Sequence, residues 1–146
     1  QVFSQPCPLF VPLVENGRFK PGDVVIETVA AEYLAPLKAA GVDTLVLGCT
    51  HYPLLEEVIG AFMGPEVRLI NTGAEGAREV ARRLTDTDAL ANRAQGTARY
   101  FVSDTVDDFA RLATIFLRED VAGQVQQVDL EKEILNHRLG IRNQAV

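Results

Sequence analysis

Short apolar segments alternate with segments of helical pattern along this chain, and this alternation limits the fold more than any other feature. Residues 43–48 (DTLVLG) and 67–71 (VRLIN) are rich in strand-forming side chains, and each precedes a helical pattern, as does 98–102. Strands that alternate with helices are typical of βα units, whose strands pair in parallel. The sequence therefore predicts an α/β fold, a mostly parallel sheet flanked by helices. The uninterrupted apolar run in 43–48 predicts a strand buried on both faces.

Helix signals are clearest after Asp23, which is a candidate N-cap. Ile26, Ala30 and Leu37 follow it at the spacing of one helix face, and Gly41 is placed to end this helix. Pro53 suits the first turn of another helix. Further helices are predicted over 54–62, 73–84 and 106–117 and, more polar, over about 130–138, with a weak strand over 125–128 and loops over 4–12 and 86–96.

Composition narrows the classes of partner. The chain has 146 residues, of which 47% are hydrophobic, so it can form one compact domain or parts of two. Its longest apolar runs fall short of the roughly 20 residues that a membrane span needs, which predicts no membrane partner. The net charge is −6 and no cluster of Lys and Arg stands out, which predicts no nucleic-acid partner.

The two cysteines, Cys7 and Cys49, lie in neither a CxxC motif nor a His-rich pattern. This spacing predicts no metal site and no disulfide framework. Free thiols persist in reducing compartments, so we expect a cytoplasmic protein.

The segment Gly48-Cys49-Thr50-His51 follows the predicted strand 43–48 directly. Ligands of open α/β sheets bind outside the carboxyl ends of the strands. A helix N-terminus just beyond Cys49 would favour its thiolate, Thr50 offers a hydroxyl to a carboxylate, and His51 can exchange a proton near neutral pH. Position alone leaves the alternative open that Cys49 is a buried packing residue, because cysteine is often buried.

The octapeptide GCTHYPLL (48–55) resembles the second catalytic-cysteine motif of glutamate racemase, the cofactor-independent enzyme that supplies D-glutamate for bacterial peptidoglycan. Residues 7–15 (CPLFVPLVE) resemble a second segment of that family. Residues 70–75 (INTGAE) match a third, in which an aspartate is common in place of Asn71. The resemblance extends to about residue 130.

The resemblance implies an isomerase that uses two cysteines, one as thiolate and one as thiol, as acid and base on opposite faces of the α-carbon, with no cofactor and no metal. It implies that Cys49 acts on the L-enantiomer and that His51 assists proton movement at Cys49. Thr50 is implied to hold the substrate, glutamate, and Glu15, which matches an acidic residue near the site, is implied to contribute to substrate binding.

Motifs of the family's first half are absent from this sequence: Asp-Ser near the N-terminus, Pro-Tyr-Gly, and Asn-Thr after the other catalytic cysteine. Cys7 does not replace that cysteine, because Pro8 follows it, and we interpret it as a small buried residue. The chain is therefore expected to match the C-terminal half of the family. Residues 1–72 would form part of the second α/β domain and residues 73–146 would complete the first. Such a piece is expected to be inactive alone and to form a homodimer that covers its exposed core.

Two other interpretations remain open from the sequence. The chain could derive from a racemase for aspartate or another amino acid, although the residues His51-Tyr52-Pro53 favour glutamate. It could instead be a racemase-derived binding module without catalysis, which the missing first cysteine favours.

Overall fold

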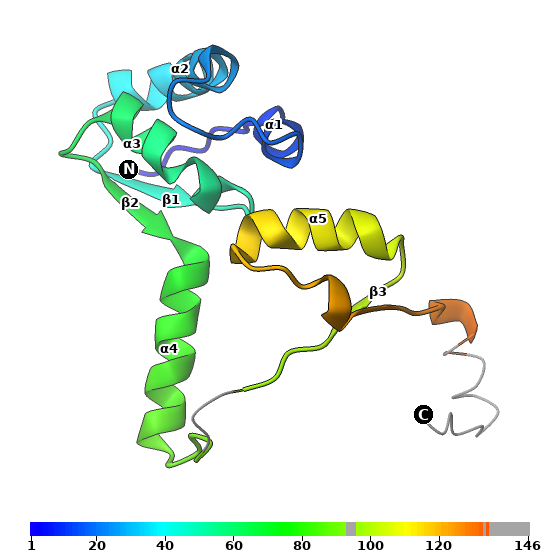
Figure 1. Cartoon of the computed structure of the whole chain (residues 1–146). Coiled ribbons are helices and arrows are strands. Elements are labelled where there is room, and N and C mark those ends of the chain that lie inside the picture. Colours follow the sequence, from blue (N-terminus) through cyan, green and yellow to red (C-terminus); the bar gives the residue numbers. More distant parts are fainter. Residues whose placement is uncertain (93–95, 133, 135–146) are drawn as a thin grey trace. The chain divides into compact units, whose positions relative to one another are not determined.

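The computed structural model describes residues 1–92, 96–132 and 134, and the chain forms two compact units, residues 1–91 and 92–146. The first unit contains α1 (Phe10–Glu15), α2 (Val24–Ala39), β1 (Thr44–Leu47), the 3₁₀ helix η1 (Tyr52–Leu55), α3 (Glu56–Met63), β2 (Arg68–Asn71) and α4 (Thr72–Asp86) (Figure 1). The second contains β3 (Tyr100–Val102), α5 (Val106–Leu117), the 3₁₀ helix η2 (Ala122–Gln124) and β4 (Val125–Gln127).

Both units contain a parallel strand pair, which confirms the predicted α/β class. In the first unit β1 pairs with β2, and Leu47 lies opposite Asn71 at the carboxyl end of the ladder. In the second unit β3 pairs with β4, and Tyr100 lies opposite Val125. The strands are one or two residues shorter than predicted at 98–102 and 125–128.

The core of the first unit lies where α2 and α3 pack together beside β1 (Figure 1). The side chain of Asp23 caps α2 by accepting the Val25 N–H, as predicted, and Gly41 follows the helix with a φ of 69°. The buried side chains come from α1, α2, β1, η1 and α3: Phe10, Val14, Ile26, Ala30, Leu34, Leu37, Leu47, Leu55, Val58, Ile59 and Met63.

The loop predicted over residues 4–12 is wrong at its end, because α1 begins at Phe10. Phe10 and Val14 are four residues apart, so they share one helix face, and both are fully buried. Pro12 is compatible with this helix because it lies in the first turn, where its missing N–H has no partner in the helix. Burial of Phe10 and Val14 therefore stabilises a helix that the Pro-rich sequence did not predict.

The prediction that the strand at 43–48 is buried on both faces is also wrong. Leu47 is buried, but the side chain of Val46 is 58% exposed. The sheet of the first unit has only two strands. Among the residues that the structure describes, helices cover one face of it, so the side chain that points to the other face stays in contact with solvent.

Three further observations concern helix ends. The helix predicted from Leu54 begins as the 3₁₀ turn η1 and becomes α-helical only at Glu56. Thr105 is the N-cap of α5, but its hydroxyl donates to Asp108 rather than capping a backbone N–H. Residues 130–132 and 134 are helical, and the rest of the helix predicted to 138 lies outside the described residues. None of the helices in the described ranges combines the length and apolar character needed to cross a bilayer.

Candidate active site

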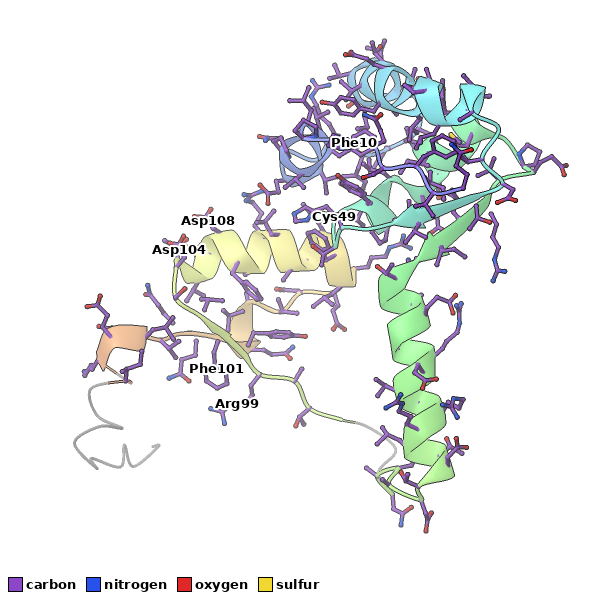
Figure 2. The ribbon with its side chains drawn as sticks, turned by 180° about the vertical axis from the view of Figure 1, so that it is seen from behind. Phe10, Cys49, Arg99, Phe101, Asp104 and Asp108 are labelled. Carbon is purple, nitrogen blue, oxygen red and sulfur yellow. The ribbon has the colours of Figure 1, made fainter. Side chains whose placement is uncertain are left out.

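The carboxyl ends of β1 and β2 form the edge of the sheet at which the motif residues lie. Because the strands are parallel, the turn after β1 and the start of α4 after β2 meet at this edge. Thr72 Oγ1 donates to the carbonyl oxygen of Leu47 at 3.2 Å, which ties the two strand ends together. Asn71 caps α4 by accepting the N–H of Ala74 at 3.1 Å. The predicted strand-end position of Cys49 is therefore confirmed (Figure 2).

Cys49 and His51 face each other across a tight turn. The carbonyl oxygen of Cys49 accepts the N–H of Tyr52 at 3.2 Å, which closes the turn. His51 Nδ1 lies 4.0 Å from Cys49 Sγ and 3.2 Å from Thr50 Oγ1. The nitrogen–sulfur distance is at the long end for a hydrogen bond, as is common for reactive groups without a bound substrate. The thiol of Cys49 is partly exposed, so a substrate can reach it.

Glu15 completes this arrangement from a distant part of the sequence. Its Oε1 lies 3.1 Å from His51 Nε2, although the two residues are 36 positions apart. The His51 side chain is 19% exposed and that of Glu15 is 42% exposed, so the imidazole is shielded from solvent more than the carboxylate. When Nε2 carries the proton and donates it to Glu15, Nδ1 is left as an acceptor toward Cys49. Carboxylate, imidazole and thiol therefore lie in series.

The helix predicted next to Cys49 begins as a 3₁₀ turn rather than as an α-helix. The turn leads into η1, a 3₁₀ helix of 4 residues, and α3 begins only at Glu56. The field of a helix dipole falls off within its first turn, and the acidic residues Glu56 and Glu57 occupy that turn. The α-helical N-terminus therefore lies several residues after Cys49, whereas the side chain of His51 lies beside it.

Cys7 lies in the interior of the first unit. Its side chain is 6% exposed and its Sγ donates to the carbonyl oxygen of Gln5 at 3.5 Å. Burial raises the pKa of the Cys7 thiol, which disfavours the thiolate. The prediction that Cys7 is a small buried residue is confirmed.

Tyr52 was missed by sequence reasoning, although it stands inside the motif. Its hydroxyl donates to the carbonyl oxygen of Cys7 at 3.3 Å. Burial raises the pKa of the Tyr52 hydroxyl, and the nearby Cys7, Cys49 and Tyr33 raise it further. The available signal was its position directly after His51, but nothing in the sequence showed what its hydroxyl would contact.

In residues 1–92, 96–132 and 134, no group of three or more His, Cys, Asp and Glu side chains is arranged to hold a metal ion.

No family model matches the chain, but comparison with known proteins finds relatives of similar sequence. A glutamate racemase of Geobacter metallireducens is 47% identical over 134 residues, which are 91% of this chain and 48% of that protein. The chain is a homologue of the glutamate racemases. It spans about half the length of the curated relatives that it matches.

Solved structures of glutamate racemases are also similar to this chain. That of Thermus thermophilus, in complex with β-chloro-D-alanine, matches 88% of this chain and 48% of its own, with a TM-score of 0.77 and 39% identity. That of Francisella tularensis, in complex with D-glutamate, matches 90% of this chain and 48% of its own, with a TM-score of 0.77 and 28% identity. The resemblance stated from residues 7–15, 48–55 and 70–75 is thereby confirmed as homology to glutamate racemases.

Proposed function

We propose that this chain provides the Cys49 side of a glutamate racemase active site, which interconverts L- and D-glutamate and supplies D-glutamate for peptidoglycan. The observation that carries the proposal is the series Glu15–His51–Cys49 at the carboxyl end of β1. A packing cysteine has no need of an imidazole held by a carboxylate, whereas an acid–base thiol does. Homology to glutamate racemases supports glutamate over the other substrates considered, and D-glutamate is bound in the Francisella tularensis structure.

The proposed chemistry moves one proton off the α-carbon and another onto it. The Cys49 thiolate removes the α-proton from one face of L-glutamate, and a second acid outside this arrangement delivers a proton to the opposite face. In the reverse direction the Cys49 thiol donates its proton. No net proton is gained or lost. His51 Nδ1 exchanges the proton with Cys49 between turnovers, and Glu15 holds the imidazole in the tautomer that permits this.

Thr50 is proposed to hold the carboxylate of glutamate. Its side chain is exposed beside Cys49, and its hydroxyl lies near His51 Nδ1, from which it can turn toward a ligand. Glu15 was predicted to contribute to substrate binding. We propose instead that it acts through His51, because its Oε1 lies 3.1 Å from the imidazole Nε2.

The domain division at residue 72, the cytoplasmic location and the homodimer are parts of the same proposal. α4 begins at Thr72 and buries none of its side chains, which supports a division there, although the compact units divide after residue 91. Cys7 and Cys49 are both free thiols, which supports a reducing compartment. A homodimer would cover exposed apolar side chains such as Val46 and Val80.

The direct test is α-proton exchange in D₂O, followed by NMR together with optical rotation, with L- and D-glutamate as substrates. Because the chain spans about half of its relatives, it is tested alone and also joined to the complementary half of the Geobacter metallireducens racemase. The joined protein is expected to racemise glutamate, and Cys49→Ser to lower its rate on the order of 10³-fold. Cys7→Ser is the matched control and should leave the rate nearly unchanged.

Each other result selects a different function. Exchange with aspartate in place of glutamate would support a related amino-acid racemase. A folded joined protein without exchange, which still binds glutamate, would support a binding module without catalysis. Racemisation by the chain alone that is lost in Cys7→Ser would show that Cys7 is the second acid.

A further inference from the structure

Tyr52 joins the two segments that carry the proposed acid–base series. It follows His51 directly in the turn after β1, and its hydroxyl donates to the carbonyl oxygen of Cys7 at 3.3 Å. The same carbonyl oxygen accepts the N–H of Phe10 at 3.1 Å, the hydrogen bond that leads the chain into α1. One acceptor therefore receives a donor from the Cys49 turn and a donor from the first residue of the helix that carries Glu15.

The ring of Phe10 fixes the same junction by packing. Phe10 is fully buried in the first unit (Figure 2). It meets the Tyr52 ring edge-to-face, with centroids 5.4 Å apart and planes at 88°, and the Tyr33 ring of α2 at 5.5 Å and 69°. Edge-to-face pairs have a preferred geometry, so they fix orientation as well as burying area. The start of α1 is therefore held against both α2 and the Cys49 turn.

Glu15 lies at the far end of α1 and makes its contact with His51 only if the helix keeps this position. α1 has 6 residues, which is too short to be stable by itself. Tertiary contacts along α1, among them those at its start, therefore set where Glu15 lies. A tyrosine hydroxyl is protonated at neutral pH, and burial raises the pKa of Tyr52 further, so it remains a donor to Cys7 there.

We propose that Tyr52 is a positioning residue: through its hydrogen bond to the Cys7 carbonyl it holds α1 so that Glu15 stays paired with His51, and thereby sets the reactivity of the Cys49 thiol. The proposal rests on the proposed function, since it concerns the same acid–base series. It separates two contributions of Tyr52. The ring packs on Phe10, whereas the hydroxyl makes the connection to α1.

Tyr52→Phe removes the hydroxyl and keeps the ring. Tyr33→Phe is the matched control, because its ring also packs on Phe10 and no hydrogen bond of its hydroxyl occurs in the described part of the chain. The measurement is the rate at which iodoacetamide alkylates Cys49 in the 146-residue chain, with peptide mapping to separate Cys49 from Cys7. Circular dichroism shows that each variant is folded.

Glu15→Gln is expected to slow alkylation of Cys49 about threefold or more at neutral pH, because His51 then loses its carboxylate partner. Tyr52→Phe is expected to slow it to a similar extent, and Tyr33→Phe to leave it unchanged. The double variant Tyr52→Phe/Glu15→Gln should be no slower than Glu15→Gln, because residues that act through one contact are not additive. A purely structural Tyr52 would instead add its effect to that of Glu15.

The outcomes separate this inference from the proposed function. If Glu15→Gln slows alkylation and Tyr52→Phe does not, the acid–base series stands and the role of Tyr52 is refuted. Additive effects in the double variant also refute it. If Glu15→Gln has no effect, the series Glu15–His51–Cys49 itself is refuted, and the role of Tyr52 with it. NMR of the His51 ring provides the second readout: Tyr52→Phe and Glu15→Gln should shift its nitrogen signals in the same direction.

Discussion

Two helices of nearly equal length, α2 and α4, both begin with a side-chain N-cap but differ in how much of their surface is buried. They have 16 and 15 residues, and each starts with a side-chain cap, Asp23 for α2 and Asn71 for α4. α2 buries Ile26, Ala30, Leu34 and Leu37, whereas α4 buries no residue. Local signals therefore determine that a helix forms, and burial determines how much that helix contributes to the stability of the unit.

α4 is held in the described structure by its own polar side chains. Glu79 pairs with Arg82 and Arg83, and Arg82 also pairs with Asp86. Its larger apolar residues remain in contact with solvent, since Val80 is 57% and Leu84 is 38% exposed. Exposed pairs of this kind contribute little to stability, because water and salt screen them. The comparison predicts that equivalent changes in α2 and α4 have different consequences.

The largest difference is expected for core truncation. Leu34→Ala in α2 should lower the free energy of unfolding by about 3 kcal/mol, because Leu34 is 3% exposed and its loss leaves a cavity. Leu84→Ala in α4 is the matched change and should cost less than about 0.5 kcal/mol. Urea unfolding followed by circular dichroism measures both. Equal losses would mean that α4 is packed as tightly as α2 in solution.

Removal of the caps should give an intermediate effect. Asp23→Ala should lower the free energy of unfolding by about 1 kcal/mol, because α2 unfolds only together with the core. Asn71→Ala should instead weaken α4 locally, with faster amide exchange along residues 72–86 and little change in the unfolding of the core. Hydrogen exchange by NMR distinguishes the two. A global loss in Asn71→Ala would show that α4 and the core unfold as one unit.

The smallest effect is expected when the pH is lowered and the Glu79 carboxylate in α4 becomes protonated. Arg82 and then Arg83 lower the pKa of Glu79 below its ordinary value of 4.5. A carboxyl whose folded pKa is lowered stabilises the helix above its unfolded pKa, and this contribution disappears as the pH falls through the folded pKa. Helical Cα chemical shifts of α4 should therefore decrease as the pH falls below 4.5.

Glu79→Gln is the control for this acid effect and should reduce its amplitude. The core residues of α2 should show no such change over the same range. Equal acid sensitivity in wild type and Glu79→Gln would assign the effect to the other carboxylates, such as Glu75 with Arg78.

Much of this architecture could be predicted from the sequence because it depends on neighbours along the chain. The cap at Asp23, the left-handed Gly41 and the alternation of strand and helix are local, and the parallel pairing of β1 with β2 follows from a helix lying between them. The octapeptide 48–55 likewise identified Cys49 and His51 as a candidate site without any structure.

The Glu15–His51 contact and the exposure of Val46 depend on tertiary packing. The pairing of Glu15 with His51 joins residues 36 positions apart, and it depends on α1, whose helical state comes from burial of Phe10 and Val14. The exposure of Val46 depends in the same way on which elements cover the sheet. Periodicity and propensity report how a segment is built, but not what lies against it. Local sequence therefore places the thiol of Cys49 at the end of a strand, whereas packing of α1 against the core places Glu15 beside His51.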